Sequence, residues 1–190
     1  DALAFEFARD LKEVFEHRGQ TVQGRPPTLV VDSLTLQIDM AARKAQWLYG
    51  KEALIKPIPL SLNAIVKAYE QQNKSIVQRS IDLPTFMAEL YQAWQELLAK
   101  RQKAPAGKRI NIVEMYSQVT LNRQTPRFWN SPARSNFKDY ERAHFVRDLV
   151  LAHAAPTITV NGATQHLHLR VETKSQADSS ARSIWIPQSA

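Results

Sequence analysis

The chain has 190 residues, 44% of them hydrophobic and only five of them glycine, which excludes a disordered or low-complexity protein. It has no cysteine, which excludes disulfides and zinc–thiolate sites, and no apolar run near the roughly 20 residues of a membrane span, so we expect a cytoplasmic protein without a membrane partner. The formal net charge of +7 is concentrated, because residues 99–138 hold nine Lys or Arg and one acid, Glu114. Such a field attracts polyanions or acidic protein surfaces, although a solvated basic loop region is the alternative.

Residues 1–80 are predicted to form a module of one helix, three strands and a second helix. Pro26-Pro27 breaks the chain before the first strand, and Gly50-Lys51 suits the turn of a hairpin. Ser61 is a suitable N-cap for the second helix. The expected elements are a helix over residues 2–18, a strand over 29–38, a hairpin over 45–58 and a helix from 61 to 79.

Two families that act on nucleic acids share this order of elements. Double-stranded-RNA-binding domains carry a Lys-rich motif at the start of the second helix, where this chain has Ser61-Leu62-Asn63-Ala64. Restriction-type nuclease cores need an acid-x-Lys motif on the third strand to hold Mg²⁺, and Ala53-Leu54-Ile55-Lys56 does not supply it. The order of elements therefore predicts a fold and no function for this module.

Residues 81–190 are predicted to form a second module of three helices and a β-hairpin. Asp82 and Asn111 are suitable N-caps, and Glu114 completes a capping box with Asn111. Asn161-Gly162 is a strong hairpin signal, because both residues tolerate the positive φ of a type I′ turn. The expected elements are helices over 83–101, from 111 onward and over 139–154, a basic insertion at 123–138, a hairpin reaching residue 171 and a C-terminal strand at 184–186. The chain as a whole is predicted to be an α+β protein.

The hairpin turn fixes a register in which Val160 faces Ala163 and Ile158 faces Gln165. Three helices followed by a hairpin, over residues 82–172, resemble the winged-helix superfamily. The resemblance implies that the helix over 139–154 lies in a major groove with two side chains toward the bases, and that the hairpin lies over the DNA backbone or the minor groove. The connection of about 16 residues before that helix departs from the short turn of the superfamily. The groove-facing residues implied are His144 and Arg147, and the wing residues implied are His166, His168 and Arg170.

The insertion, residues 123–138, mixes basic and aromatic side chains and contains no acid. This mixture suits phosphate neutralisation with base stacking, or an interface with an acidic protein, or aromatic residues that fix the loop to the core. The residues expected to neutralise phosphates are Lys100, Arg101, Lys103, Lys108, Arg109, Arg123, Arg127, Arg134 and Lys138. The residues expected to stack or dock are Phe128, Trp129 and Phe137.

The sequence carries no complete catalytic signature, and we expect no catalytic residue, no metal and no cofactor. His166 and His168 have the i, i+2 spacing of a metal chelate, but no third ligand is evident. Glu172-Thr173-Lys174 resembles the acid-x-Lys motif of nucleases, without a suitable upstream Asp. The leading expectation is a non-enzymatic module that binds nucleic acid, with duplex DNA as the target, within a longer protein or complex. The alternatives are a module that docks on an acidic partner and a metal-dependent nuclease.

Overall fold

The computed structural model describes residues 2–155, 157–171, 173 and 183–187. The chain is an α+β protein, as predicted, and it divides into two compact units. Unit 1 comprises Asp1–Arg79 and Trp185–Ala190, and unit 2 comprises Ser80–Ile184. No helix in the described part of the chain combines the length and the apolar character that crossing a membrane requires.

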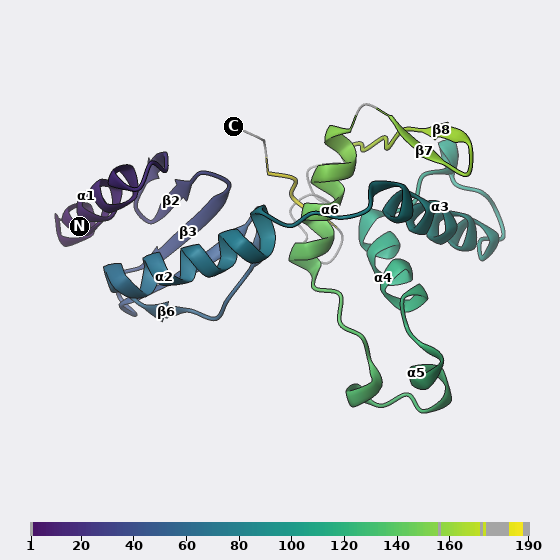
Figure 1. The fold of residues 1–190 in the computed structure, drawn as a ribbon, viewed down its shortest axis with the longest axis horizontal. Coiled ribbons are helices and arrows are strands. Elements are labelled where there is room, and N and C mark those ends of the chain that lie inside the picture. The colour runs from purple at the N-terminus through teal and green to yellow at the C-terminus, as the bar shows by residue number, and fades with distance from the viewer. Residues whose placement is uncertain (1, 156, 172, 174–182, 188–190) are drawn as a thin grey trace. The chain divides into compact units, whose positions relative to one another are not determined.

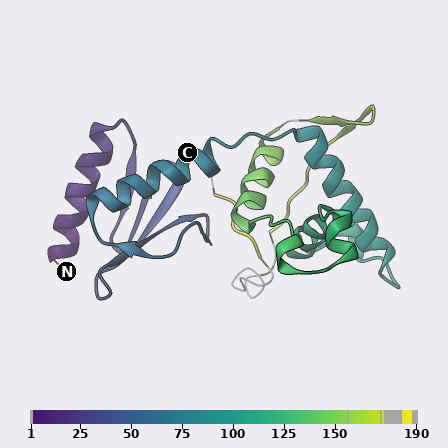
Figure 2. The same cartoon turned by 60° about the horizontal axis from the view of Figure 1, so that its bottom comes forward.

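Unit 1 is an antiparallel sheet with two helices packed on one of its faces (Figure 2). The helices meet the sheet through Phe15, Trp47 and Tyr69, whose rings lie 5.0 to 6.0 Å apart and are almost fully buried. The strand order is β1-β2-β3-β4-β5, with β6 also paired to β4. The elements are α1 (Ala2–His17), β1 (Val22–Arg25), β2 (Thr28–Val31), β3 (Leu34–Asp39), β4 (Lys44–Tyr49), β5 (Glu52–Ala53), β6 (Ile58–Pro59), α2 (Leu62–Gln72) and a π-helical turn (Asn73–Val77).

The single strand predicted over residues 29–38 is wrong, because Asp32 turns the chain with a φ of 50° and separates β2 from β3. Asp and Asn are among the few residues that adopt this left-handed conformation readily. The Asp32 side chain accepts the N–H of Thr21 at 3.0 Å and the hydroxyl of Tyr69 at 2.9 Å. Burial, together with the hydrogen bond and the charge of Asp32, raises the pKa of Tyr69. Pro26-Pro27 forms the turn between β1 and β2, so the sheet gains a strand that the sequence did not predict.

Other parts of unit 1 follow the sequence. The turn and the pairing of the predicted hairpin are confirmed, since β4 and β5 pair across Gly50, whose φ is 58°. The second strand is shorter than predicted, because β5 ends at Ala53 and no strand follows until Ile58. Ser61 occupies the N-cap position of α2, but its side chain makes no capping hydrogen bond. The predicted C-terminal strand at residues 184–186 is wrong, because the described segment 183–187 contains no strand. Trp185 instead packs beside the β4–β5 turn, where the Lys51 ammonium lies 3.7 Å from the centroid of its ring.

Unit 2 is mainly helical (Figure 1), with three principal helices. The rings of Phe86 and Phe145 meet edge to face in its core. Both predicted caps are confirmed: Asp82 accepts the N–H of Thr85 and Asn111 accepts that of Val113, each at 2.9 Å. The elements are α3 (Leu83–Ala99), a 3-10 turn η2 (Ala106–Lys108), α4 (Ile112–Asn122), α5 (Pro126–Asn130), a 3-10 turn η3 (Arg134–Asn136), α6 (Arg142–Ala154), β7 (Ile158–Val160) and β8 (Ala163–Gln165).

The hairpin pairs in the predicted register, with Val160 opposite Ala163 and Ile158 opposite Gln165, and β7 lies against α3. Its second strand is shorter than predicted, since β8 ends at Gln165 and no strand follows within residues 166–171. The register explains this difference. Gln165 already pairs with Ile158, the first residue of β7, and His168 would face Ala155, the C-cap of α6, so the later residues have no strand to pair with.

Candidate binding surface of unit 2

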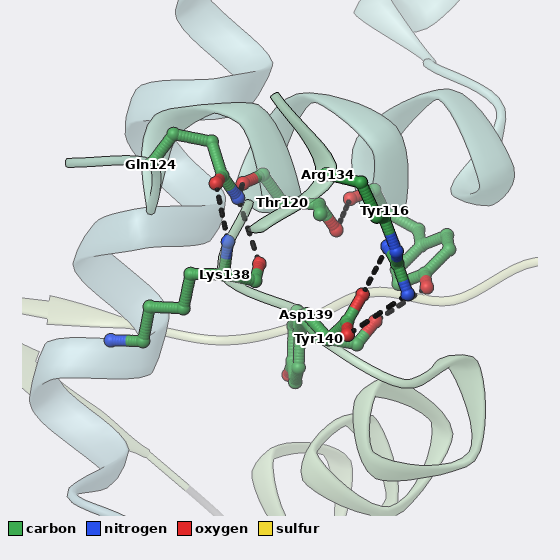
Figure 3. Close-up of polar contacts among 7 residues, drawn as sticks. All are labelled: Tyr116, Thr120, Gln124, Arg134, Lys138, Asp139 and Tyr140. Atoms are coloured by element: carbon green, nitrogen blue, oxygen red, sulfur yellow. Dashed lines mark hydrogen bonds and ion pairs between the residues drawn. The ribbon is translucent and has the colours of Figure 1, made fainter. Parts of the chain in front are cut away.

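The insertion is closed at its neck by the buried side chain of Gln124 (Figure 3). Its Oε1 accepts the N–H of Lys138 at 2.8 Å, and its Nε2 donates to the C=O of the same residue at 2.9 Å. Nε2 also donates to the C=O of Thr120 at 2.8 Å. The two ends of the insertion are therefore held together and tied to the last turn of α4.

Arg123 fastens the same neck to the core of unit 2. Its Nε and Nη2 donate to the two carboxylate oxygens of Glu89 at 3.0 and 2.6 Å, and its guanidinium lies 3.8 Å from the centroid of the Tyr140 ring. Burial lowers the pKa of Arg123, but the hydrogen bond to Glu89 and the electrostatic interactions with Tyr140, Glu89 and Asp148 give a net rise. Arg123 thus stays charged, and its charge is compensated inside the unit.

Tyr140 links Arg123 to the buried carboxylate of Asp148 in the core of unit 2. Its hydroxyl donates to the carboxylate of Asp148 at 2.6 Å, and Asp148 is fully buried in α6. Tyr116 donates its hydroxyl to the C=O of Tyr140 at 2.5 Å (Figure 3). These contacts join α3, α4 and α6 directly behind the insertion, so the segment stands on a fixed base.

The tip of the insertion presents one aromatic side chain to solvent. Phe128 and Phe137 are half-buried and pack edge to face at 5.4 Å, whereas Trp129 is 56% exposed and rests against Phe128 at 5.2 Å. The first two rings therefore fix the loop, and the third is free to meet a partner. The sequence predicted a loop here, but Thr125 and Pro126 begin the short helix α5, a start signal that the pattern of apolar residues did not reveal.

The basic residues of the insertion differ in their surroundings. Arg127 and Lys138 are exposed, and Arg134 forms a two-point ion pair with Asp139 at 2.8 and 3.1 Å (Figure 3). Asp139 lies just outside the insertion and neutralises part of its charge. Arg127, Arg134 and Lys138 are therefore all cations at the surface of the insertion, and of these Arg134 is paired with Asp139.

A second basic segment is the α3–α4 link, residues 100–111. Arg101 pairs with Glu114 at 2.7 Å. Lys100 donates to the Gln118 side chain at 2.9 Å. The link docks on α3 through the Trp94 indole, which donates to the C=O of Lys108 at 2.8 Å. The exposed basic residues of the link are Lys100, Arg101, Lys103, Lys108 and Arg109.

Helix α6 offers little exposed surface. His144 and Arg147, which the winged-helix resemblance implies would face the groove, are both half-buried, and only His153 and Ala154 are exposed along the helix. The helix has little exposed surface because other parts of unit 2 pack against several of its sides and bury residues there. The buried residues of α6 are Ala143, Phe145, Val146, Asp148, Leu149 and Ala152.

The β7–β8 hairpin lies away from the insertion. His166, His168 and Arg170 are exposed, and the rings of the two histidines lie 4.7 Å apart. No group of three potential metal ligands occurs among the residues that the structure describes, and Glu172 and Lys174 of the acid-x-Lys triplet lie outside them. Figures 1 and 2 place the β7–β8 hairpin and α5 at opposite ends of unit 2. The hairpin and the insertion are therefore separate candidate surfaces.

Comparison with protein-family models, with curated proteins and with solved structures finds no match for this chain.

Proposed function

We propose that the chain binds nucleic acid through the insertion, as a non-enzymatic module. Trp129 stacks on an unpaired base, while Arg127 and Lys138 neutralise neighbouring phosphates. The observation that carries this proposal is the exposed indole of Trp129 on a tip that contains no acid. An exposed Trp is unfavourable in water, and a base or a partner surface removes that cost.

The fixed base of the insertion supports the proposal. Gln124 closes the neck and Arg123 fastens it to Glu89, so the indole is held in position before a ligand arrives. A side chain ordered in advance loses less conformational entropy on binding, which raises affinity. Stacking on an aromatic ring tolerates any base, so we expect weak sequence preference.

The burial of α6 directs the proposal toward unpaired nucleotides. A helix that reads duplex DNA needs a row of exposed side chains to reach base edges in the major groove. His144 and Arg147 are half-buried in this helix. Duplex DNA, the target implied by the winged-helix resemblance, is therefore the less favoured ligand, and single-stranded nucleic acid is the preferred one.

A second candidate function is docking on an acidic protein. Leu121, 41% exposed in the last turn of α4, precedes the insertion closely and adds an apolar side chain that a nucleic acid does not require. Trp and Arg are also the residues that most often dominate protein interfaces. The two candidates share Trp129 and Arg127 and differ in the importance of Leu121.

Fluorescence anisotropy with labelled dT12, and with a 12-base-pair duplex, tests the proposal over a range of salt concentrations. We expect dT12 to bind with log K falling by about 0.7 per phosphate contact per unit of log salt. Trp129→Ala should weaken binding by at least about fivefold, and Tyr91→Ala, at an exposed aromatic residue of α3, is the matched control. Leu121→Ala should leave the affinity unchanged. Absence of binding at low salt, or unchanged affinity of Trp129→Ala, contradicts the proposal.

A further inference from the structure

Unit 1 contains an open groove of about 710 Å³ at the end of the β3–β4 hairpin, in the size range of small-ligand sites. Its apolar side is formed by Phe5 of α1, the prolines Pro26, Pro27 and Pro57, and Met40. Phe5 is 57% exposed, although α1 buries other apolar residues in the core. A flat ring left uncovered beside prolines is a surface on which another planar ring can stack.

The polar side of the groove comes from the sheet. Gln37 and Gln46 are paired residues on β3 and β4, and both line the groove. The Nε2 of Gln46 donates to the C=O of Ile55 at 2.7 Å, which fixes this carboxamide, and Gln37 is exposed. A carboxamide offers a donor and an acceptor side by side, which matches the edge of a nucleobase.

The charge around the groove is positive. Lys44 lines it, and Arg25, Arg43 and Lys56 are exposed chain neighbours of lining residues. Asp39 also lines the groove, where it stands opposite Lys44 in the β3–β4 register, and its Oδ1 accepts the N–H of Ala42 at 2.8 Å. Unit 1 as a whole has 11 basic and nine acidic residues. Four of the basic residues (Arg25, Arg43, Lys44 and Lys56) and two of the acidic residues (Asp39 and Glu6, which is next to Phe5 in the chain) belong to the groove and its surroundings. The rest of the unit is therefore balanced, and its excess charge lies at the groove.

We propose that this groove binds a nucleoside phosphate, with the base on Phe5, its edge at Gln37 and the phosphate at Lys44. The apolar ring surface, the carboxamides and the cations match the three parts of such a ligand. The ligand is either a free nucleotide or one nucleotide of a strand. The site lies in unit 1 and does not depend on the insertion proposed above.

Isothermal titration of the full chain with AMP, UMP, adenosine and inorganic phosphate, and separately with dT12, tests the inference. The variants are Phe5→Ala, Gln37→Ala and Lys44→Gln, all at exposed positions. Leu3→Ala, at an exposed residue of α1, and Lys67→Gln, at an exposed residue of α2, are matched controls. Circular dichroism confirms that each variant is folded.

We expect AMP or UMP to bind more tightly than adenosine or phosphate alone. Phe5→Ala and Lys44→Gln should each weaken binding by at least about fivefold, while the controls should not. If dT12 alone shows these losses, the ligand is a nucleotide within a strand. The inference is overturned if mononucleotides do not bind and dT12 affinity falls in Trp129→Ala but not in Phe5→Ala or Lys44→Gln. That result would leave the insertion proposal standing. Equal binding of phosphate and AMP, or no response to any of the three groove variants, also overturns it.

Discussion

The carboxamide of Gln124 meets the main chain of Lys138 on both sides, accepting its N–H and donating to its C=O. This two-point pairing resembles one rung of a β-ladder made by a side chain, and it joins the residues at the two ends of the insertion. Because Gln124 also bonds to the C=O of Thr120, the neck moves with α4. The position of the exposed Trp129 therefore depends on this buried amide as well as on the Arg123–Glu89 pair.

Gln124→Leu should destabilise unit 2 and loosen the insertion. The substitution removes three hydrogen bonds and leaves main-chain groups of Lys138 without this partner, which we expect to cost about 2 kcal/mol of unfolding free energy. Chemical denaturation measures the loss, and hydrogen exchange should show faster exchange at the Lys138 amide. Gln102→Leu, at an exposed residue of the α3–α4 link, is the control. Equal stability of the two variants would mean that other contacts hold the neck.

Arg123→Ala should also destabilise the unit, by about 1 to 3 kcal/mol, because it leaves the half-buried Glu89 carboxylate without its two-point partner. Arg123→Lys should not restore stability fully, since an ammonium cannot make the bidentate contact or stack in the same way on Tyr140. A double-mutant cycle with Glu89→Gln separates the pair from the stacking. Full additivity in that cycle would show that the ion pair contributes nothing.

Features that depend on neighbouring residues could be predicted from the sequence. The Asn161-Gly162 turn set the register of β7 and β8, and the caps at Asp82 and Asn111 accept the N–H groups of the helices that follow them. Each of these depends on the backbone preference or the short side chain of a residue beside the element.

Features that depend on distant partners could not be predicted in this way. The end of β8 depends on where α6 ends. The positive charge of Arg123 is compensated by the carboxylate of Glu89, which lies on another helix. Counting charges located a basic segment but could not show that Arg134 is paired with Asp139 while Arg127 is exposed. A linear pattern also gave α6 an outward face, because it could not reveal how many elements pack around that helix.

Tyr69→Phe should change the response of unit 1 to alkaline pH. Burial and the contact with Asp32 raise the pKa of Tyr69, so its contribution to stability is present in full below its ordinary pKa of about 10 and is lost as the pH rises from there toward its folded-state pKa. We expect the variant to lose about 1 kcal/mol at neutral pH, from the hydrogen bond to Asp32, and to show a flatter decline above pH 10. Thermal denaturation at pH 7 to 11 measures both effects. Tyr91→Phe, at an exposed residue, is the control, and identical pH profiles for the two variants would exclude this role for Tyr69.

Asp82 should make the stability of unit 2 sensitive to acid. Its carboxylate accepts the N–H of Thr85 at the start of α3, and this hydrogen bond lowers the pKa of Asp82. A lowered folded-state pKa gives a contribution that is present above the ordinary pKa of about 4 and is lost as the pH falls through the folded-state value. Asp82→Asn keeps a cap that does not titrate, so its melting temperature should fall less than that of the parent chain between pH 5 and pH 2. Asp82→Ala should begin from a lower melting temperature at pH 7, because the helix then has no side-chain cap. If the parent and Asp82→Asn chains lose stability in parallel throughout this range, the cap does not contribute to the acid response.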